Sequence, residues 1–146
     1  MSAHAADRNA EVELTPTEFG THGDGIARDA DGRVVSIPGA IPGERVRIKP
    51  LARRRGVVHA QVVDVLEPSP DRAEPPCPEV ANGCGACQWQ HIDVDAQQAY
   101  KRMLVAQSLG LVGETALTRL RPTVALPAAG FRTTVHAAVH HGPVCG

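Results

Sequence analysis

The sequence predicts a mainly β fold, a small closed barrel of five strands, followed by a cysteine-rich loop, one helix and one further strand. Three observations predict it. Short β-type runs broken by glycine turns fill the first half of the chain, prolines crowd the segment that follows, and only four of the 146 residues are aromatic. A core built mainly from Val, Ile, Leu and Ala favours a small, locally closed unit.

The predicted barrel strands lie between Val12 and Leu66. Gly32 can supply the positive φ that a hairpin turn needs, and the two Pro-Gly pairs at residues 38–39 and 42–43 make a helix there unfavourable. Residues 1–10 are small and polar without periodicity, which predicts a disordered leader. The five expected strands are Val12–Thr15, Gly25–Arg28, Val34–Ile37, Arg45–Ile48 and Val57–Leu66.

A helix and a strand are expected beyond the barrel. Five prolines between Pro68 and Pro78 exclude regular structure and place a domain border near Pro68. Asp95 is expected to cap a helix that runs to about Leu109 and ends at Gly110 or Gly113. Its predicted apolar side contains Ala99, Met103 and Ala106, and residues 131–140 alternate as a half-buried strand does.

Three cysteines form a C-x6-C-x2-C array at Cys77, Cys84 and Cys87. Thiolates are soft ligands suited to zinc or an iron-sulfur cluster, and glycines within the array remove side chains that would obstruct close approach. Three ligands are too few for a closed site, and the residues leave the fourth open between His91 and Cys145. There are two alternatives. The three cysteines could bind zinc together with His91, or they could be reduced cysteines that bind no metal.

Six basic side chains fall within eleven residues, at the end of a predicted strand and in the loop expected after it. Such a cluster can form a phosphate-binding face for RNA, because guanidinium groups bind phosphate oxygens bidentately. A solvated loop is the equally weighted alternative, because the predicted barrel also carries many acidic residues. The candidate RNA-binding residues are Arg45, Arg47, Lys49, Arg53, Arg54 and Arg55.

Other single residues carry less weight. Trp89 is expected to pack over a metal centre rather than to stack on a base. His136, His140 and His141 fit the polar face of the predicted strand. Cys145 is assigned no role, and no catalytic residue is predicted in this chain. The N-terminus lacks an apolar segment of signal-peptide length and no stretch approaches a membrane span, so a cytoplasmic location without membrane contact is expected.

These residues together resemble the N-terminal part of the class I SAM-dependent RNA (uracil-5-)methyltransferases, which begin with a TRAM domain. The resemblance covers nearly the whole chain. The motifs that carry it are Gly23-Asp-Gly-Ile-Ala-Arg28, Val34-Val-Ser-Ile-Pro-Gly-Ala-Ile-Pro-Gly-Glu-Arg-Val46, Pro68-Ser-Pro-Asp-Arg72, Cys84-Gly-Ala-Cys-Gln-Trp-Gln-His91, and Gln97 with Lys101.

The resemblance implies an OB-like five-stranded TRAM barrel that binds RNA over residues 11–70 and a cluster loop over residues 71–93. It implies that Cys77, Cys84 and Cys87 hold a [4Fe-4S] cluster whose fourth ligand is not in this chain, since Cys145 does not match the family's fourth cysteine. Residues 94–146 would begin a truncated α+β central domain. SAM would be used by the full-length enzyme only.

The expected function is therefore that of the RNA-binding front part of a uracil-C5 methyltransferase for ribosomal or transfer RNA, truncated before the catalytic domain. In the family a cysteine attacks C6 of a flipped uracil and C5 takes the methyl group. This chain is expected to be inactive alone, to be monomeric and not to bind DNA. The alternative is a stand-alone TRAM-type RNA-binding protein with an iron-sulfur or zinc site.

Overall fold

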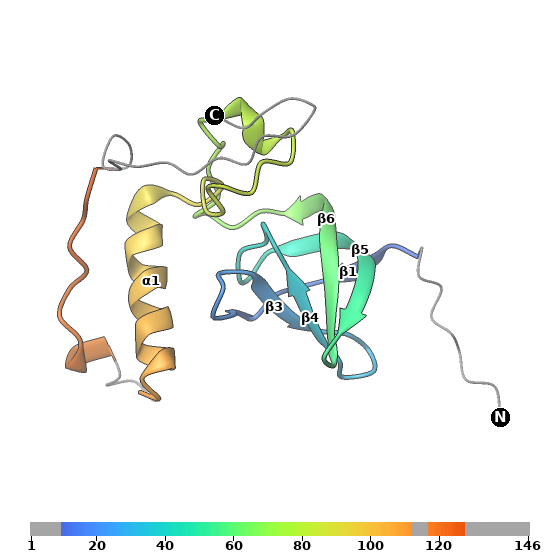
Figure 1. The fold of residues 1–146 in the computed structure, drawn as a ribbon, viewed down its shortest axis with the longest axis horizontal. Coiled ribbons are helices and arrows are strands. Elements are labelled where there is room, and N and C mark those ends of the chain that lie inside the picture. Colours follow the sequence, from blue (N-terminus) through green and yellow to red (C-terminus); the bar gives the residue numbers. More distant parts are fainter. Residues whose placement is uncertain (1–9, 112–116, 128–146) are drawn as a thin grey trace. The chain divides into compact units, whose positions relative to one another are not determined.

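A computed structural model describes residues 10–111 and 117–127 of the chain. The chain divides into two compact units, one that ends at Arg72 and one that begins at Ala73. We call them the β unit and the α unit after their main elements (Figure 1). The predicted leader up to residue 9, the predicted strand at residues 131–140 and Cys145 lie outside the described residues.

The β unit is a curled six-stranded sheet, which confirms the mainly β prediction but corrects its details. The prediction of five strands missed the two-residue strand β2, because so short a run has no readable period. The order β1-β5-β6-β4-β3-β2 leaves β1 and β2 as edges, so the described strands form a half-barrel rather than a closed ring. The strands are β1 (Val12–Leu14), β2 (Glu18–Phe19), β3 (Gly25–Arg28), β4 (Val34–Ile37), β5 (Arg45–Arg54) and β6 (Val57–Glu67).

Strand β5 is longer than predicted, and the loop expected after Ile48 is wrong. The pairing with β6 continues antiparallel from Arg45 to Arg54, and Pro50 lies opposite Ala60. Proline donates no hydrogen bond to a ladder, and a register shift between Pro50 and Ala52 marks a bulge at this point. The bulge lets the hairpin continue past a residue that normally ends a strand.

The core of the β unit follows from strand alternation. In β5, Val46 and Ile48 are buried while the basic residues between and beside them face outward. Parallel pairing of β4 with β6 brings Val35 beside Val58 and completes the apolar interior. The buried cluster consists of Ala27, Val35, Ile37, Ala40, Val46, Ile48 and Ala60.

Two consecutive Pro-Gly turns connect β4 to β5 and confirm that no helix forms there. Gly39 and Gly43 have φ values of 81° and 91°, and the amide nitrogens of Ala40 and Glu44 donate back to Ile37 and Ile41 at 3.3 and 3.2 Å. Proline followed by glycine with positive φ is the pattern of a type II turn. The turns fold the segment tightly, and Ala40 and Ile41 between them are fully buried.

The glycine at position 25 is required by a close approach of two backbones. A Cβ atom at Gly25 would lie 2.8 Å from the carbonyl oxygen of Ala40 and 3.2 Å from Cβ of Pro16. Real Cβ atoms do not approach a backbone oxygen so closely, so the site excludes any larger residue. This explains the second glycine of the Gly23-Asp-Gly25 motif.

The α unit contains helix α1 (Val94–Ser108) and two 3-10 turns, η1 (Pro78–Val80) and η2 (Leu117–Arg119). The helix begins two residues before its predicted start and ends one residue before its predicted end. Asp93 rather than Asp95 caps it, because the Asp93 side chain accepts from the amides of Asp95 and Ala96. Of the three residues predicted to form its apolar side, only Ala106 is buried. Among the described residues, no helix is both long enough and apolar enough to cross a membrane.

Candidate nucleic-acid interface

The turn between β5 and β6 carries the densest basic group of the chain. Arg54 pairs with Val57, so Arg55 and Gly56 form a two-residue hairpin loop. Both have positive φ, 50° and 86°, as a type I′ turn requires, and Arg55 is the only non-glycine residue with positive φ in the described chain. Arg55 occupies a backbone conformation that Asn or Gly adopts more easily, so its positive φ is locally strained. The side chain is exposed, and packing therefore does not explain why an arginine stands here.

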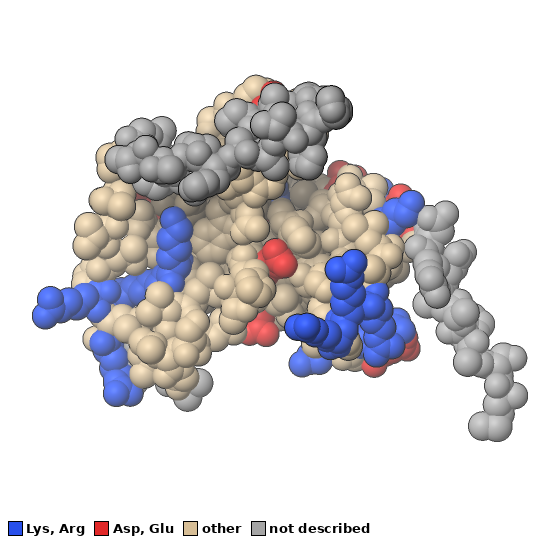
Figure 2. All heavy atoms as spheres, viewed as in Figure 1, with Lys and Arg blue, Asp and Glu red and all other residues tan. Residues whose placement is uncertain are grey.

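Arg53, Arg54 and Arg55 are all exposed, and among the described residues none of them has an ion pair. Consecutive residues of a strand point to opposite sides, so Arg53 and Arg54 flank the hairpin while Arg55 occupies its tip. Figure 2 shows Lys and Arg side chains gathered at this end of the β unit. Three unpaired guanidinium groups on one turn are available to phosphate oxygens.

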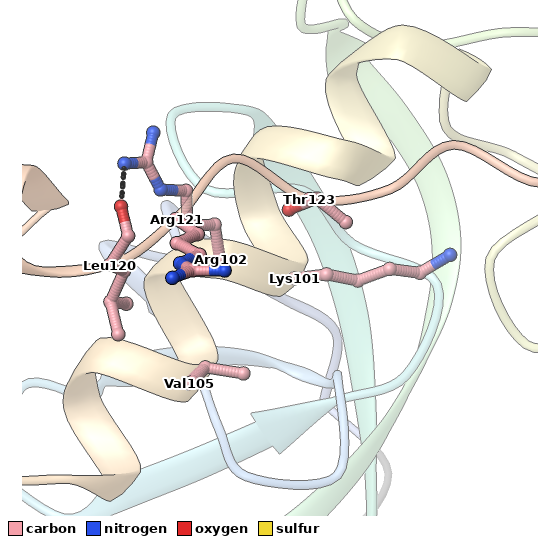
Figure 3. Close-up of a pocket in the computed structure, with 6 residues that line it drawn as sticks. All are labelled: Lys101, Arg102, Val105, Leu120, Arg121 and Thr123. Carbon is pink, nitrogen blue, oxygen red and sulfur yellow. Dashed lines mark hydrogen bonds between the residues drawn. The ribbon is translucent and has the colours of Figure 1, made fainter.

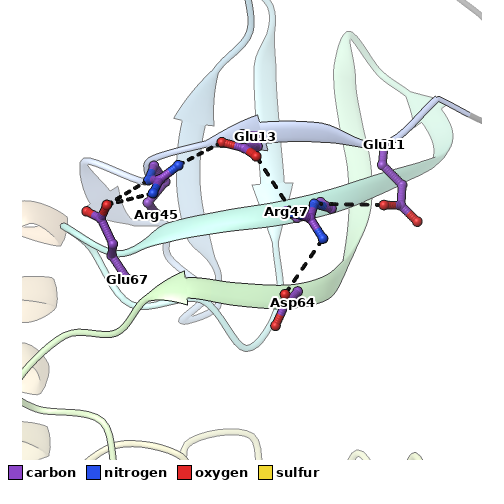
Figure 4. Close-up of polar contacts among 6 residues, drawn as sticks. All are labelled: Glu11, Glu13, Arg45, Arg47, Asp64 and Glu67. Atoms are coloured by element: carbon purple, nitrogen blue, oxygen red, sulfur yellow. Dashed lines mark hydrogen bonds and ion pairs between the residues drawn. The ribbon is translucent and has the colours of Figure 1, made fainter.

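Arg45 and Arg47, at the other end of β5, are held by carboxylates. Arg45 binds Glu67 at 2.7 Å and Glu13 at 2.9 Å, and Arg47 lies 3.7 Å from Asp64 (Figure 4). The hydrogen bonds that Arg45 donates to Glu67, and next those to Glu13, raise the pKa of Arg45 above its ordinary value. The structure therefore separates the six predicted residues into ion-paired and unpaired groups.

Lys49 lies between these groups. It faces outward beside Gln61 on β6 and has no ion pair among the described residues. The basic side chains of β5 thus change along the strand from neutralised at Arg45 to unpaired at the turn. Sequence alone does not reveal this gradient, because the carboxylates come from β1 and β6.

A buried carboxylate that sequence reasoning did not single out organises the end of the β unit. Glu44 is 0% exposed, and its side chain accepts from the amides of Ile41 at 2.9 Å and Ser69 at 3.0 Å. Arg72 donates to both of its oxygens and to the carbonyl of Gly39. Glu44 and Arg72 both lie in motifs on which the family resemblance rests. Their place in these motifs was the only feature of the sequence that could have indicated their importance.

The charge of Glu44 is stabilised in place. Burial raises the pKa of this carboxyl, but the hydrogen bond from Arg72 and those from the Ile41 and Ser69 amides more than offset the effect. The pKa of Glu44 therefore lies below its usual range. The pair joins the Pro-Gly turns to the segment after β6 and fixes where the chain leaves the half-barrel.

The cysteine loop of the α unit is held by backbone contacts rather than by a disulfide. Cys77 precedes η1, its amide donates to the Gln90 side chain at 3.2 Å, and the Cys84 amide donates to the carbonyl of Glu79 at 3.0 Å. All three thiols are free, with Cys77 and Cys84 half-buried and Cys87 exposed. The loop therefore carries three reduced thiols, of which only Cys87 belongs to an exposed residue.

The donor chemistry of this loop suits a soft metal or cluster, but the placement of the donors does not. In residues 10–111 and 117–127, no group of three or more Cys, His, Asp or Glu side chains is close enough to hold a metal ion. The three cysteines and His91 are thus not brought to one point. The ligands predicted from the sequence therefore do not form a metal site in the described arrangement.

The end of the cysteine loop is fastened to α1. The Gln97 side chain donates to the carbonyls of Trp89 at 3.1 Å and Ile92 at 3.0 Å, and Lys101 donates to Gln97 at 3.3 Å. Trp89 meets Tyr100 edge to face, with ring centroids 6.3 Å apart. These contacts give the Gln97 and Lys101 motif a positioning role, and Trp89 packs on the helix.

Residues 7–63, which contain most of the half-barrel and its basic hairpin, match the family model of the TRAM domain. The wider chain matches the N-terminal part of RNA methyltransferases. An uncharacterized RNA methyltransferase of Halalkalibacterium halodurans is 39% identical over 82% of this chain and 26% of its own length. The 23S rRNA (uracil(1939)-C(5))-methyltransferase RlmD of Halomonas elongata is 39% identical over 77% of this chain and 24% of its own length.

The chain spans about a quarter of the length of the curated relatives that it matches. Among solved structures, the tRNA (uracil-54, C5)-methyltransferase of Pyrococcus abyssi, in complex with S-adenosyl-L-homocysteine, is 22% identical. It aligns over 67% of this chain and 21% of its own, with a TM-score of 0.48. The matched region of the relatives is their N-terminal quarter and does not include their catalytic region.

Proposed function

We propose that this chain is the RNA-binding N-terminal portion of a SAM-dependent uracil-C5 methyltransferase that acts on ribosomal or transfer RNA. The observation that carries the proposal is the match of about four fifths of the chain to RNA methyltransferases, combined with three unpaired arginines on the turn of its TRAM domain. Methyl transfer from SAM belongs to the full-length enzyme. This chain contributes capture of the RNA.

The proposed contact is between phosphate oxygens and the hairpin turn. Within residues 10–111 and 117–127, no carboxylate pairs with Arg53, Arg54 or Arg55 and would have to be displaced by phosphate, and Lys49 extends the same strand. Arg45 and Arg47 are secondary candidates, because RNA must compete there with Glu13, Glu67 and Asp64. Phosphate contacts hold RNA in position without reading its sequence, so selection of one uridine is left to other parts of the enzyme.

The test is the salt dependence of RNA binding by the 146-residue chain. Replacement of Arg53, Arg54 and Arg55 with glutamine should weaken binding and reduce the slope of log K against log salt. The reduction should be about 0.7 to 0.9 for each lost phosphate contact. Fluorescence anisotropy with a labelled RNA hairpin at several salt concentrations measures both quantities.

A charge-balanced control separates a local contact from general electrostatics. Arg33→Gln combined with Asp31→Gln removes a cation and its paired carboxylate, both outside the candidate RNA-binding residues, without changing net charge. This double variant should retain the affinity and slope of the wild type. A triple turn variant with an unchanged slope would exclude the hairpin from the interface.

We also infer that Cys77, Cys84 and Cys87 serve as ligands of a [4Fe-4S] cluster, with a fourth ligand from elsewhere. What supports this is the donor set, three free thiols within eleven residues, together with open space at Gly83 and Gly85, where a Cβ would meet nothing within 4 Å. Because the thiols do not converge in the described arrangement, the loop must rearrange to bind a cluster. The rival is zinc bound with His91.

Anaerobic reconstitution with iron and sulfide, followed by visible absorption and metal analysis, distinguishes these ligands. A brown protein that loses its colour when Cys84 is replaced with serine supports the cluster. A colourless protein with one zinc per chain supports the rival. A chain that retains neither metal after reconstitution would exclude both, and the RNA-binding test would be unaffected because it concerns the β unit.

A further inference from the structure

The α unit contains a pocket outside the sites described so far. The pocket has a volume of about 250 Å³ and lies between α1 and the segment that follows η2 (Figure 3). Three of its six lining residues are basic, and none is acidic. The lining residues are Lys101, Arg102, Val105, Leu120, Arg121 and Thr123.

The surrounding sequence has a strong excess of positive charge. From residue 96 to residue 146 there are five basic residues and a single acidic residue, Glu114, whereas residues 1–95 have ten basic and fifteen acidic residues. Among the described residues, none of the three cations that line the pocket forms an ion pair. An uncompensated group of cations in a concave site concentrates anions.

The hydrogen bonds around the pocket fix its shape and leave donors available. Arg102 donates through Nη2 to the carbonyls of Leu117 and Leu120, both at 2.5 Å, which fastens the segment to the helix. Its Nε is buried and has no hydrogen-bond partner among the described residues. A buried charged donor without a partner is unfavourable, so the Arg102 guanidinium carries positive charge that is not fully satisfied within the described residues.

The other two cations are less constrained. Lys101 makes one long contact to Gln97 at 3.3 Å, which leaves further ammonium hydrogens free. Arg121 is exposed and makes no ion pair among the described residues. The Thr123 hydroxyl is already used, since it donates to the carbonyl of Gln98 at 3.2 Å.

We propose that this pocket binds a phosphate group through Arg102 and Arg121. Planar guanidinium groups match the oxygens of phosphate in geometry and charge. The Lys101 side chain points away from both arginines (Figure 3), so it contributes positive charge rather than a direct contact. Val105 and Leu120 form an apolar wall that limits the room for water around the anion. The phosphate can come from an RNA backbone or from a free phosphate compound, and the proposal holds for either source.

The test uses the 146-residue chain, isotopically labelled, with inorganic phosphate titrated at constant ionic strength against sodium chloride. Saturable NMR shifts at Val105 and Thr123 are expected. Arg121→Gln should weaken phosphate binding at least threefold, and Lys101→Gln should weaken it by a smaller factor. Arg119→Gln is the matched control, because Arg119 is exposed on η2, does not line the pocket and should leave binding unchanged.

Shifts that do not saturate, or an Arg121→Gln variant that binds phosphate as the wild type does, would overturn the proposal. Where phosphate binding is observed, a second arm identifies its source from RNA binding by the same variants. A salt slope lower by about 0.7 in Arg121→Gln, but not in Arg119→Gln, identifies the RNA backbone. Equal salt slopes for Arg121→Gln and Arg119→Gln identify a free phosphate compound. Loss of RNA binding by the hairpin variants does not change the result of the phosphate titration.

Discussion

Arg72 binds Glu44 through two parallel hydrogen bonds, from Nε to Oε1 and from Nη2 to Oε2, and the Glu44 carboxylate is completely buried. The remaining capacity of that carboxylate is filled by the amides of Ile41 and Ser69. A buried charge is tolerated when it is paired and fully hydrogen-bonded, as here. The pair connects residues 28 positions apart and closes the β unit at its end.

Removal of Arg72 should destabilise the β unit strongly. Arg72→Ala leaves the Glu44 carboxylate buried without its cation, which costs about 3–5 kcal/mol of unfolding free energy. Urea denaturation followed by circular dichroism measures the change. Arg45→Ala, which breaks exposed ion pairs, is the control and should change stability little. A similar small loss for both variants would show that the buried pair has no special role.

The stability of the β unit should fall in acid because of Glu44. Its pKa is lower in the folded chain than its ordinary value of 4.5, so the folded state binds its proton less readily than the unfolded state. The resulting stabilisation is complete above about pH 4.5 and is lost as pH falls through the folded pKa. Urea midpoints between pH 7 and pH 3 should show this loss, and Glu44→Gln should flatten the profile. A profile that is equally steep in the variant would assign the acid sensitivity to other carboxylates.

Alanine should not be tolerated at position 25. The new Cβ would lie 2.8 Å from the Ala40 carbonyl oxygen, and separation of the two backbones should cost about 1–3 kcal/mol. Thermal or urea unfolding measures the loss. Gly85→Ala is the matched control, because a Cβ there would meet nothing within 4 Å and its stability should change little. Equal stability of Gly25→Ala and wild type would contradict the close approach.

Arg55 should contribute to RNA binding while its backbone conformation lowers the stability of the β unit. Its φ of 50° is unfavourable for most side chains, whereas Asn tolerates the left-handed region. Arg55→Asn should therefore unfold at a higher urea concentration than Arg55→Ala, while both weaken RNA binding to the same extent through loss of one phosphate contact. RNA affinity retained in both variants would mean that the arginine is at the turn for another reason.

Much of the fold was predictable because local patterns decided it. Alternating apolar residues placed four of the six strands close to their observed bounds, and Pro-Gly pairs excluded a helix between β4 and β5. The spacing of apolar and capping residues placed α1, although Asp93 rather than Asp95 caps it. The sequence did not reveal β2 or the extension of β5 through Pro50, since a two-residue strand and a bulge depend on pairing with neighbours.

By itself, the sequence determined a mainly β unit, a helix, a three-cysteine loop and a cluster of six basic residues. Only the tertiary structure decided which of those basic residues are free to bind, because the carboxylates that neutralise Arg45 and Arg47 come from other strands. It also decided that Glu44 is buried against Arg72 and that α1 forms a basic pocket with residues 120–123. Charge along a chain is local, but its compensation depends on distances that only folding sets.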